Sequence, residues 1–99
     1  MTRVELTLAA VEDLDRLIIT HSLPVDTHMR VRRSLGILEL FPSVGRQLGR
    51  PWDSICFILG PWRWLLIVYL HDEQQDVVSI LTIQDARSSI AVTNLIDPR

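Results

Sequence analysis

Apart from histidine, arginine is the only basic side chain in this 99-residue sequence, which has ten arginines and no lysine. A guanidinium binds phosphates and carboxylates, but it stays protonated near neutral pH and therefore cannot serve as a general base. Cleavage of RNA through its 2′-hydroxyl needs a group that takes up that proton, a group that protonates the leaving oxygen, and cations that hold the phosphate. The arginines can supply only the last of these three.

Histidine and tyrosine are the remaining candidates for proton transfer. His21, His28 and His71 are spread along the chain, and no spacing brings two of them together. A histidine at the end of a helix, as we expect for His21, often only complements the helix dipole. Tyr69 lies in an apolar run, where we expect a buried ring with one satisfied hydroxyl. The single cysteine, Cys56, and the lack of any ligand spacing predict neither a metal site nor a cofactor.

The composition argues against several function classes. The net charge is −2, so the basic field that draws nucleic acid to a protein non-specifically is absent. The longest apolar stretch, residues 55–70, is interrupted by Gly60, Pro61 and Arg63, which argues against a membrane span. The first residues carry charges of both signs and no long apolar core, unlike a signal peptide. We therefore expect one cytoplasmic domain over residues 1–99.

Hydrophobic periodicity predicts an α+β domain in the order β-α-α-β-β-β. Alternation predicts a strand over Arg3–Leu8, with Leu8 on its buried face. Helical spacing then predicts helices over Ala9–His21 and Val25–Phe41, joined as an antiparallel hairpin. The apolar residues that define the second helix are Val25, Met29, Leu35, Leu38 and Phe41.

The second half of the chain is predicted to form three strands in a meander after a loop that runs from Pro42 to about Trp52. The strands are rich in β-branched and aromatic residues and are predicted over Asp53–Leu59, Trp62–His71 and Asp76–Gln84. The middle strand is apolar on both faces, which predicts a place in the interior of the sheet. Layers of this kind place the helices on one face of the sheet.

Taken together, these segments resemble the RelE/ParE family of toxins from bacterial type II toxin–antitoxin systems. Three elements carry the resemblance, which spans about Val4 to Ser88: the Pro-x-x-Gly-Arg pattern at Pro42–Arg46, the strand-like run Trp62–Tyr69, and a final strand followed by Arg87. The resemblance implies a helical hairpin packed on a twisted, mostly antiparallel sheet. It also implies a partner antitoxin that covers an apolar groove of the toxin.

The resemblance leaves two activities open, because RelE-like members cut messenger RNA on the ribosome whereas ParE-like members poison DNA gyrase. Arg63, expected on the third strand, and Arg87 match positions at which RelE-like enzymes place phosphate-binding arginines, and Arg46 can approach from the loop. The alternative interpretation is that these arginines lie on solvated edges or in local ion pairs, such as one between Asp85 and Arg87.

The lysines of RelE-like nucleases, and their aromatic or histidine near the C-terminus, have no counterpart in this sequence. The residues therefore favour a ParE-like gyrase poison that is not an enzyme. An mRNA interferase that uses Arg46, Arg63 and Arg87 is the first alternative. A partner-binding module with lost toxicity is the second.

Four residues are predicted at a partner interface: Arg30, Arg33, Trp62 and Trp64. Arg30 and Arg33 are three residues apart and share a helix face. Such a face is often only solvated. As an interface, it would suit an acidic antitoxin or gyrase surface better than nucleic acid.

Overall fold

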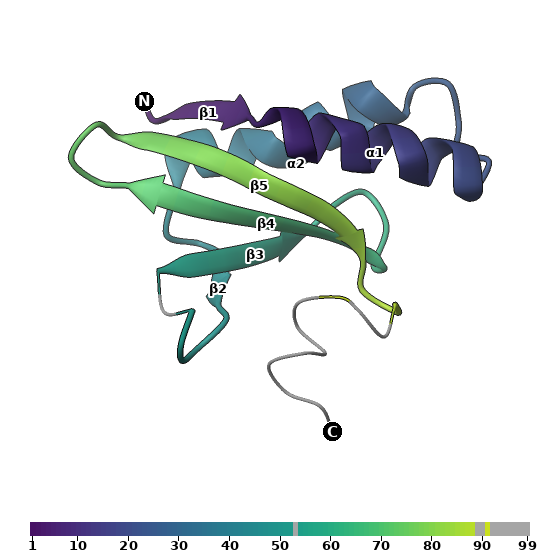
Figure 1. Ribbon diagram of the computed structural model, residues 1–99. Coiled ribbons are helices and arrows are strands. Elements are labelled where there is room, and N and C mark those ends of the chain that lie inside the picture. The colour runs from purple at the N-terminus through teal and green to yellow at the C-terminus, as the bar shows by residue number, and fades with distance from the viewer. Residues whose placement is uncertain (53, 89–90, 92–99) are drawn as a thin grey trace.

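The computed structural model describes residues 1–52, 54–88 and 91, and these residues form two helices and a five-stranded sheet (Figure 1). In chain order the elements are β1 (Arg3–Leu6), α1 (Leu8–Thr20), α2 (Thr27–Leu40), β2 (Arg46–Gln47), β3 (Ile55–Leu59), β4 (Leu65–Asp72) and β5 (Val77–Asp85). The sequence predicted this α+β class and this order, except for the short strand β2. The strand predicted over Asp53–Leu59 starts at residue 53, which lies outside the described residues.

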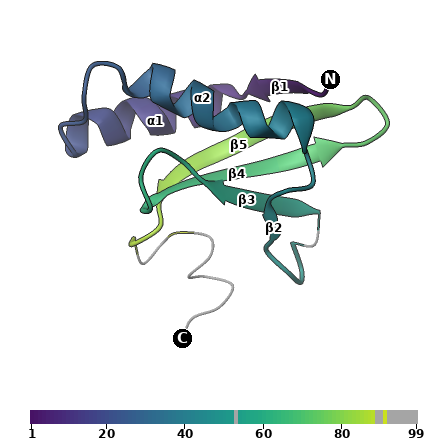
Figure 2. The ribbon, with the colours of Figure 1, turned by 180° about the vertical axis from the view of Figure 1, so that it is seen from behind.

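The strands lie in the order β1-β5-β4-β3-β2. β1 runs parallel to β5, and every other neighbouring pair is antiparallel. Both helices lie on the same side of the sheet, which is the upper side in Figure 1 and is seen from behind in Figure 2. The predicted helical hairpin on a mostly antiparallel sheet is therefore confirmed.

β4 occupies the centre of the sheet, as its sequence predicted. All five residues from Leu65 to Tyr69 are buried, so both faces of this strand are covered. The main core lies between the sheet and the helices, where Leu65, Ile67 and Tyr69 pack with Leu14 of α1 and Leu35 of α2. The predicted strand Trp62–His71 begins later than expected, because residues 61–64 form a turn that precedes β4.

The first strand is shorter than predicted, and the reason is a helix cap. Thr7 has extended backbone angles, and its hydroxyl oxygen accepts a hydrogen bond from the amide of Ala10 at 3.2 Å. This bond satisfies one of the free amides of the first helical turn. Leu8 therefore begins α1 and is 74% exposed, so the prediction that it lies on the buried face of the strand was wrong.

The same threonine ties α1 to an irregularity of the sheet. The register of the pairing between β4 and β5 shifts between Val68 and Tyr69, so that Val68 pairs with Thr82 while Tyr69 pairs with Ile80. The Thr7 hydroxyl donates to the Ile80 carbonyl at 2.7 Å. A bulge of this kind bends the strand and directs its later side chains differently from a regular alternation.

The second helix buries a different stripe from the one predicted. Its buried residues are Thr27, Val31, Leu35 and Leu38. Val25 precedes the helix and is fully exposed, and Met29 and Phe41 are more than half exposed. Leu35 and Leu38 were predicted correctly, but the spacing of apolar residues alone does not distinguish the buried stripe from a second one on the opposite face. No helix within the described part of the chain is long and apolar enough to cross a membrane.

Candidate functional site

One end of the sheet carries a cluster of stacked rings and cations that joins both helices to the strands. We call it the tryptophan cluster, and its members are His21, Arg30, Trp62, Trp64, Asp85 and Arg87. The Trp62 and Trp64 rings stack at 5.8 Å between centroids, and the His21 ring stacks on Trp64 at 4.8 Å. Both tryptophans are in the turn before β4, whereas His21 follows α1. The cluster therefore connects segments that are far apart in the sequence.

Two guanidinium groups lie against these rings. The Arg30 guanidinium is 5.9 Å from the centroid of Trp62, and the Arg87 guanidinium is 4.9 Å from that of Trp64. Cations over indole faces are attracted by the ring quadrupole, with a contribution of about 0.5–1 kcal/mol at exposed sites. Three of the four predicted partner-binding residues thus lie in one place. Arg33, the fourth, lies on α2 with its guanidinium on the sulfur of Met29 at 3.3 Å.

Asp85 is the anionic centre of the cluster. Its carboxylate accepts two hydrogen bonds from the Arg87 guanidinium, each at 3.0 Å, and one from the Arg87 amide at 2.9 Å. It also pairs with Nε2 of His21 at 3.0 Å. The Arg87 guanidinium, helped by the Arg87 amide and His21, keeps the pKa of the Asp85 carboxyl well below its usual range despite burial. The predicted ion pair between Asp85 and Arg87 is confirmed.

The residues that we considered for proton transfer all have partners. Nδ1 of His21 is 2.9 Å from the Thr20 hydroxyl, so both of its ring nitrogens are occupied. His28 pairs with Asp15 at 3.0 Å and His71 with Asp76 at 3.2 Å. A substrate hydroxyl would have to displace one of the two contacts of His21, whereas His28 and His71 are each paired through Nε2. Within the described residues, no group of three or more histidine, cysteine, aspartate or glutamate side chains could hold a metal ion.

Tyr69 is fully buried and clamps the loop that leads to Arg46. Its hydroxyl donates to the Pro42 carbonyl and accepts from the Gly45 amide, both at 2.9 Å. Burial raises the pKa of the Tyr69 phenol, so the hydroxyl stays protonated and serves as a donor. The prediction of a core tyrosine with a satisfied hydroxyl is confirmed, and the Pro-x-x-Gly-Arg pattern acquires a structural role.

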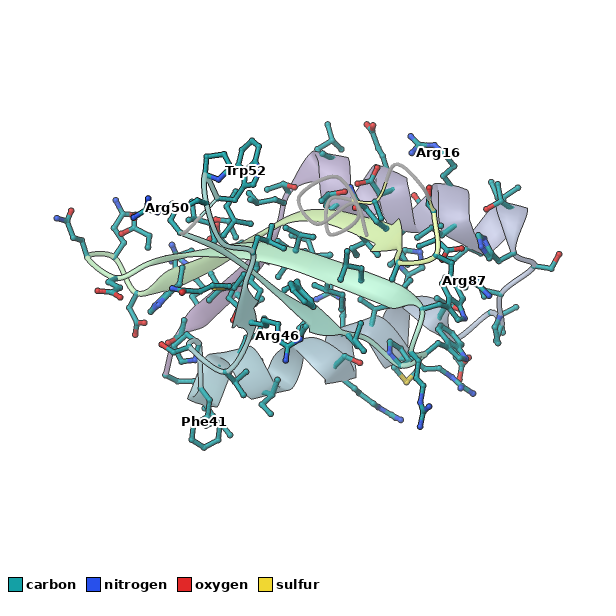
Figure 3. All side chains as sticks on the ribbon, turned by 90° about the horizontal axis from the view of Figure 1, so that it is seen from below. Arg16, Phe41, Arg46, Arg50, Trp52 and Arg87 are labelled. Atoms are coloured by element: carbon teal, nitrogen blue, oxygen red, sulfur yellow. The ribbon has the colours of Figure 1, made fainter. Side chains whose placement is uncertain are left out.

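The structure does not bring the three predicted phosphate-binding arginines to one point. In the register of the sheet, Arg46 of β2 pairs with Phe57 of β3. Phe57 pairs with Val68 of β4, and Val68 pairs with Thr82 of β5. Arg46 is three strands away from β5, roughly 14 Å across the sheet. Arg87 lies beyond the end of β5, on Asp85 and Trp64, and Figure 3 shows the two arginines over different parts of the sheet.

Arg63 differs from its predicted position, because it lies in the turn between β3 and β4 and not on a strand. Leu65, two residues later, pairs with Asp85, so Arg63 belongs to the same end of the sheet as Arg87. Arg46, Arg50 and Arg63 are exposed, and no ion pair holds them within the described residues. They are therefore available to an anion, whereas Arg87 is neutralised by Asp85.

Sequence reasoning did not find His21 and Asp85 as members of the cluster. The signal was weak: an isolated histidine after a helix and an aspartate at the end of a strand, 64 residues apart. The strand bulge contributes to this difficulty, because it changes which side chains of β5 face the helices. Only the local pair of Asp85 with Arg87 could be predicted from the sequence.

No protein-family model and no curated protein matches the chain. Its architecture nevertheless defines a small α+β protein with two helices on a mixed five-stranded sheet, and solved structures share it. The chain is similar to the isolated Escherichia coli RelE toxin, with a TM-score of 0.63, 13% identity, and coverage of 99% of this chain and 98% of that one. The protein thus has the RelE/ParE toxin fold.

Two structures of complexes are also similar. A chain of the Mycobacterium tuberculosis toxin–antitoxin complex RelBE2 matches with a TM-score of 0.63 and 24% identity over 85% of this chain and 96% of that one. A chain of the archaeal RelE–RelB complex from Pyrococcus horikoshii matches with a TM-score of 0.57 and 20% identity over 89% and 100%, respectively. At these identities the similarity concerns the fold.

Proposed function

We propose that this protein is the toxin of a toxin–antitoxin pair of the RelE type and that a cognate antitoxin neutralises it. The observation that carries the proposal is the near-complete overlap with the isolated RelE toxin, at 99% of this chain and 98% of that one. Two further similar structures are toxin–antitoxin complexes, which supports an antitoxin partner.

The proposed target is ribosome-bound messenger RNA. RelE structures among the neighbours favour this alternative over the gyrase poison that the sequence favoured. Exposed arginines without ion pairs, Arg46 and Arg63 among them, suit contacts with RNA phosphates. The interferase would act by holding and orienting the RNA strand through these arginines, which themselves supply no proton acceptor.

Gyrase inhibition is the second candidate function, and one observation favours it. Both ring nitrogens of His21 and the hydroxyl of Tyr69 are engaged by neighbouring groups, so neither residue can accept a proton from a substrate without first losing one of these contacts. A poison that only binds its target has no such requirement. This candidate implies that the arginines contact a protein surface.

The experiment is induced expression in a bacterial host, followed by two assays with the purified protein. Growth arrest, together with cleavage of messenger RNA in a translation reaction and normal gyrase supercoiling, is the expected result. Inhibited supercoiling with intact messenger RNA would replace the proposed target by gyrase. Normal growth at high expression, with no effect in either assay, would reject the toxin and leave a partner-binding module.

A further inference from the structure

Helix α2 carries apolar side chains on two opposite faces. The stripe of Thr27, Val31, Leu35 and Leu38 is buried against the sheet. At about 100° per residue, Met29, Arg33, Ile37 and Leu40 lie on the opposite side of the helix. Met29, Ile37 and Leu40 are between 45% and 62% exposed. One apolar stripe is enough to pack a helix on its own domain, and the second is not covered by the part of the chain that the structure describes.

The exposed stripe continues past the end of the helix. Phe41 and Val44 are 59% and 51% exposed, and a shallow groove runs along residues 40–44. Figure 3 shows the Phe41 side chain projecting away from the ribbon. We call the surface formed by Met29, Arg33, Ile37, Leu40, Phe41 and Val44 the α2 face. An exposed apolar surface of this continuity marks an interaction site in a soluble protein.

The charge around the α2 face is opposite in sign to that of the whole protein. α2 contains three arginines and one glutamate, a balance of +2 in a chain whose net charge is −2. Arg30 and Arg32 flank the stripe on its two sides, and Arg33 lies within it. Among the described residues, Arg32 and Arg33 form no ion pair, while Arg30 pairs with Asp26 at 3.0 Å. The surface is therefore apolar along its axis and cationic at its margins.

We infer that the α2 face binds an amphipathic helix of a partner protein whose apolar stripe is flanked by aspartate or glutamate. The helix is the matching shape, because a straight apolar stripe about 20 Å long, the length of α2, fits residues at i, i+3 or i+4 and i+7 of a second helix. The acidic flanks meet Arg32 and Arg33. Taken with the proposed function, on which this naming of the partner rests, the helix belongs to the antitoxin.

The test is a selection of helical peptides of about 20 residues from a displayed library against the immobilised full-length chain. We expect enriched peptides to combine apolar residues at helical spacing with acidic flanks. Their affinity should fall at least roughly tenfold for Ile37→Asp and for Arg33→Glu, and it should weaken at high salt. The matched control is Ile19→Asp, which places the same charge at a 78%-exposed apolar position of α1 and should leave binding unchanged.

Three results would overturn the inference. Selected peptides that bind Ile37→Asp as well as they bind the unmodified chain would assign the interaction to another surface. Enrichment of peptides with basic flanks would contradict the charge argument. A dimer of the chain that Ile37→Asp dissociates would assign the face to a second copy. Because the selection does not involve growth arrest, its outcome is independent of whether the protein is a toxin.

Discussion

The hydroxyl of Tyr69 lies 2.9 Å from the amide nitrogen of Gly45 and accepts its hydrogen bond. The same hydroxyl donates to the carbonyl of Pro42, so the central strand β4 is bonded twice to the segment that leads into β2. Gly45 has no side chain, and this permits the close approach, because a Cβ at this position would overlap the tyrosine ring and hydroxyl. Arg46 follows Gly45 directly, so these two hydrogen bonds also fix the position of its backbone.

Replacement of Tyr69 by phenylalanine removes both hydrogen bonds and keeps the ring in the core. We expect the free energy of unfolding to fall by about 1–3 kcal/mol, because the Gly45 amide and the Pro42 carbonyl lose their partner in a partly buried site. Urea denaturation measures this loss. Amide hydrogen exchange at Gly45 should accelerate more than exchange within β4. Unchanged exchange at Gly45 would show that the clamp does not fix the loop.

Replacement of Gly45 by alanine tests the close approach itself. The added methyl group would overlap Tyr69, and we expect a loss of about 1–3 kcal/mol as the loop or the ring shifts. Gly36→Ala is the matched control, since a methyl group at this position of α2 would meet no neighbouring atom within 4 Å. That variant should gain up to about 1 kcal/mol, because alanine favours helices more than glycine does. Thermal unfolding of both variants gives the comparison, and equal effects of the two would contradict the steric explanation.

Much of the fold could be predicted because its elements follow local rules. The run Leu65–Tyr69 is apolar at every position, and only the interior of a sheet buries both faces of a strand. The start of α1 was misplaced because alternation continues through Leu8, whereas the cap formed by Thr7 decides where the helix begins. In α2 the spacing fits two stripes, and the choice between them depends on the sheet that covers one.

The candidate site was less predictable, for a physical reason. His21 is hydrogen-bonded to Asp85 and stacks on Trp64, and both are tertiary contacts between residues far apart in the sequence. Such contacts have no local signature, and the bulge in β5 alters the alternation that would otherwise relate Asp85 to the core. The bond of Asp85 to Arg87 could be predicted because the two residues are neighbours along the chain.

Replacement of Asp85 by asparagine should make stability less sensitive to acid. The folded-state pKa of Asp85 is lowered, so its contribution is complete above the ordinary carboxyl pKa of about 3.9 and is lost as the pH falls toward the folded-state value. We expect Asp85→Asn to lose about 1–2 kcal/mol near neutral pH, a value reduced because Arg87 is largely exposed. The difference from the unmodified chain should shrink below about pH 4.

Urea denaturation at a series of pH values measures this difference. Asp15→Asn is the control, because the pair of Asp15 with His28 is more than half exposed on both sides and should contribute less than about 0.5 kcal/mol. A stability difference for Asp85→Asn that stays constant from neutral to acid pH would contradict the assigned role of the carboxylate.

Replacement of Arg63 by glutamine should separate activity from stability. Arg63 is exposed and has no ion pair in the described structure, so the change should alter the free energy of unfolding by less than about 0.5 kcal/mol. As a phosphate contact in the proposed function, it should nevertheless weaken messenger RNA cleavage roughly tenfold or more. Arg87→Gln should lower both quantities, because Arg87 also holds Asp85 and covers Trp64. Arg3→Gln is the control, because it removes the same charge at the opposite end of the sheet and should leave cleavage intact. Equal cleavage by all three variants would exclude a phosphate-binding role for the end of the protein that carries the tryptophan cluster.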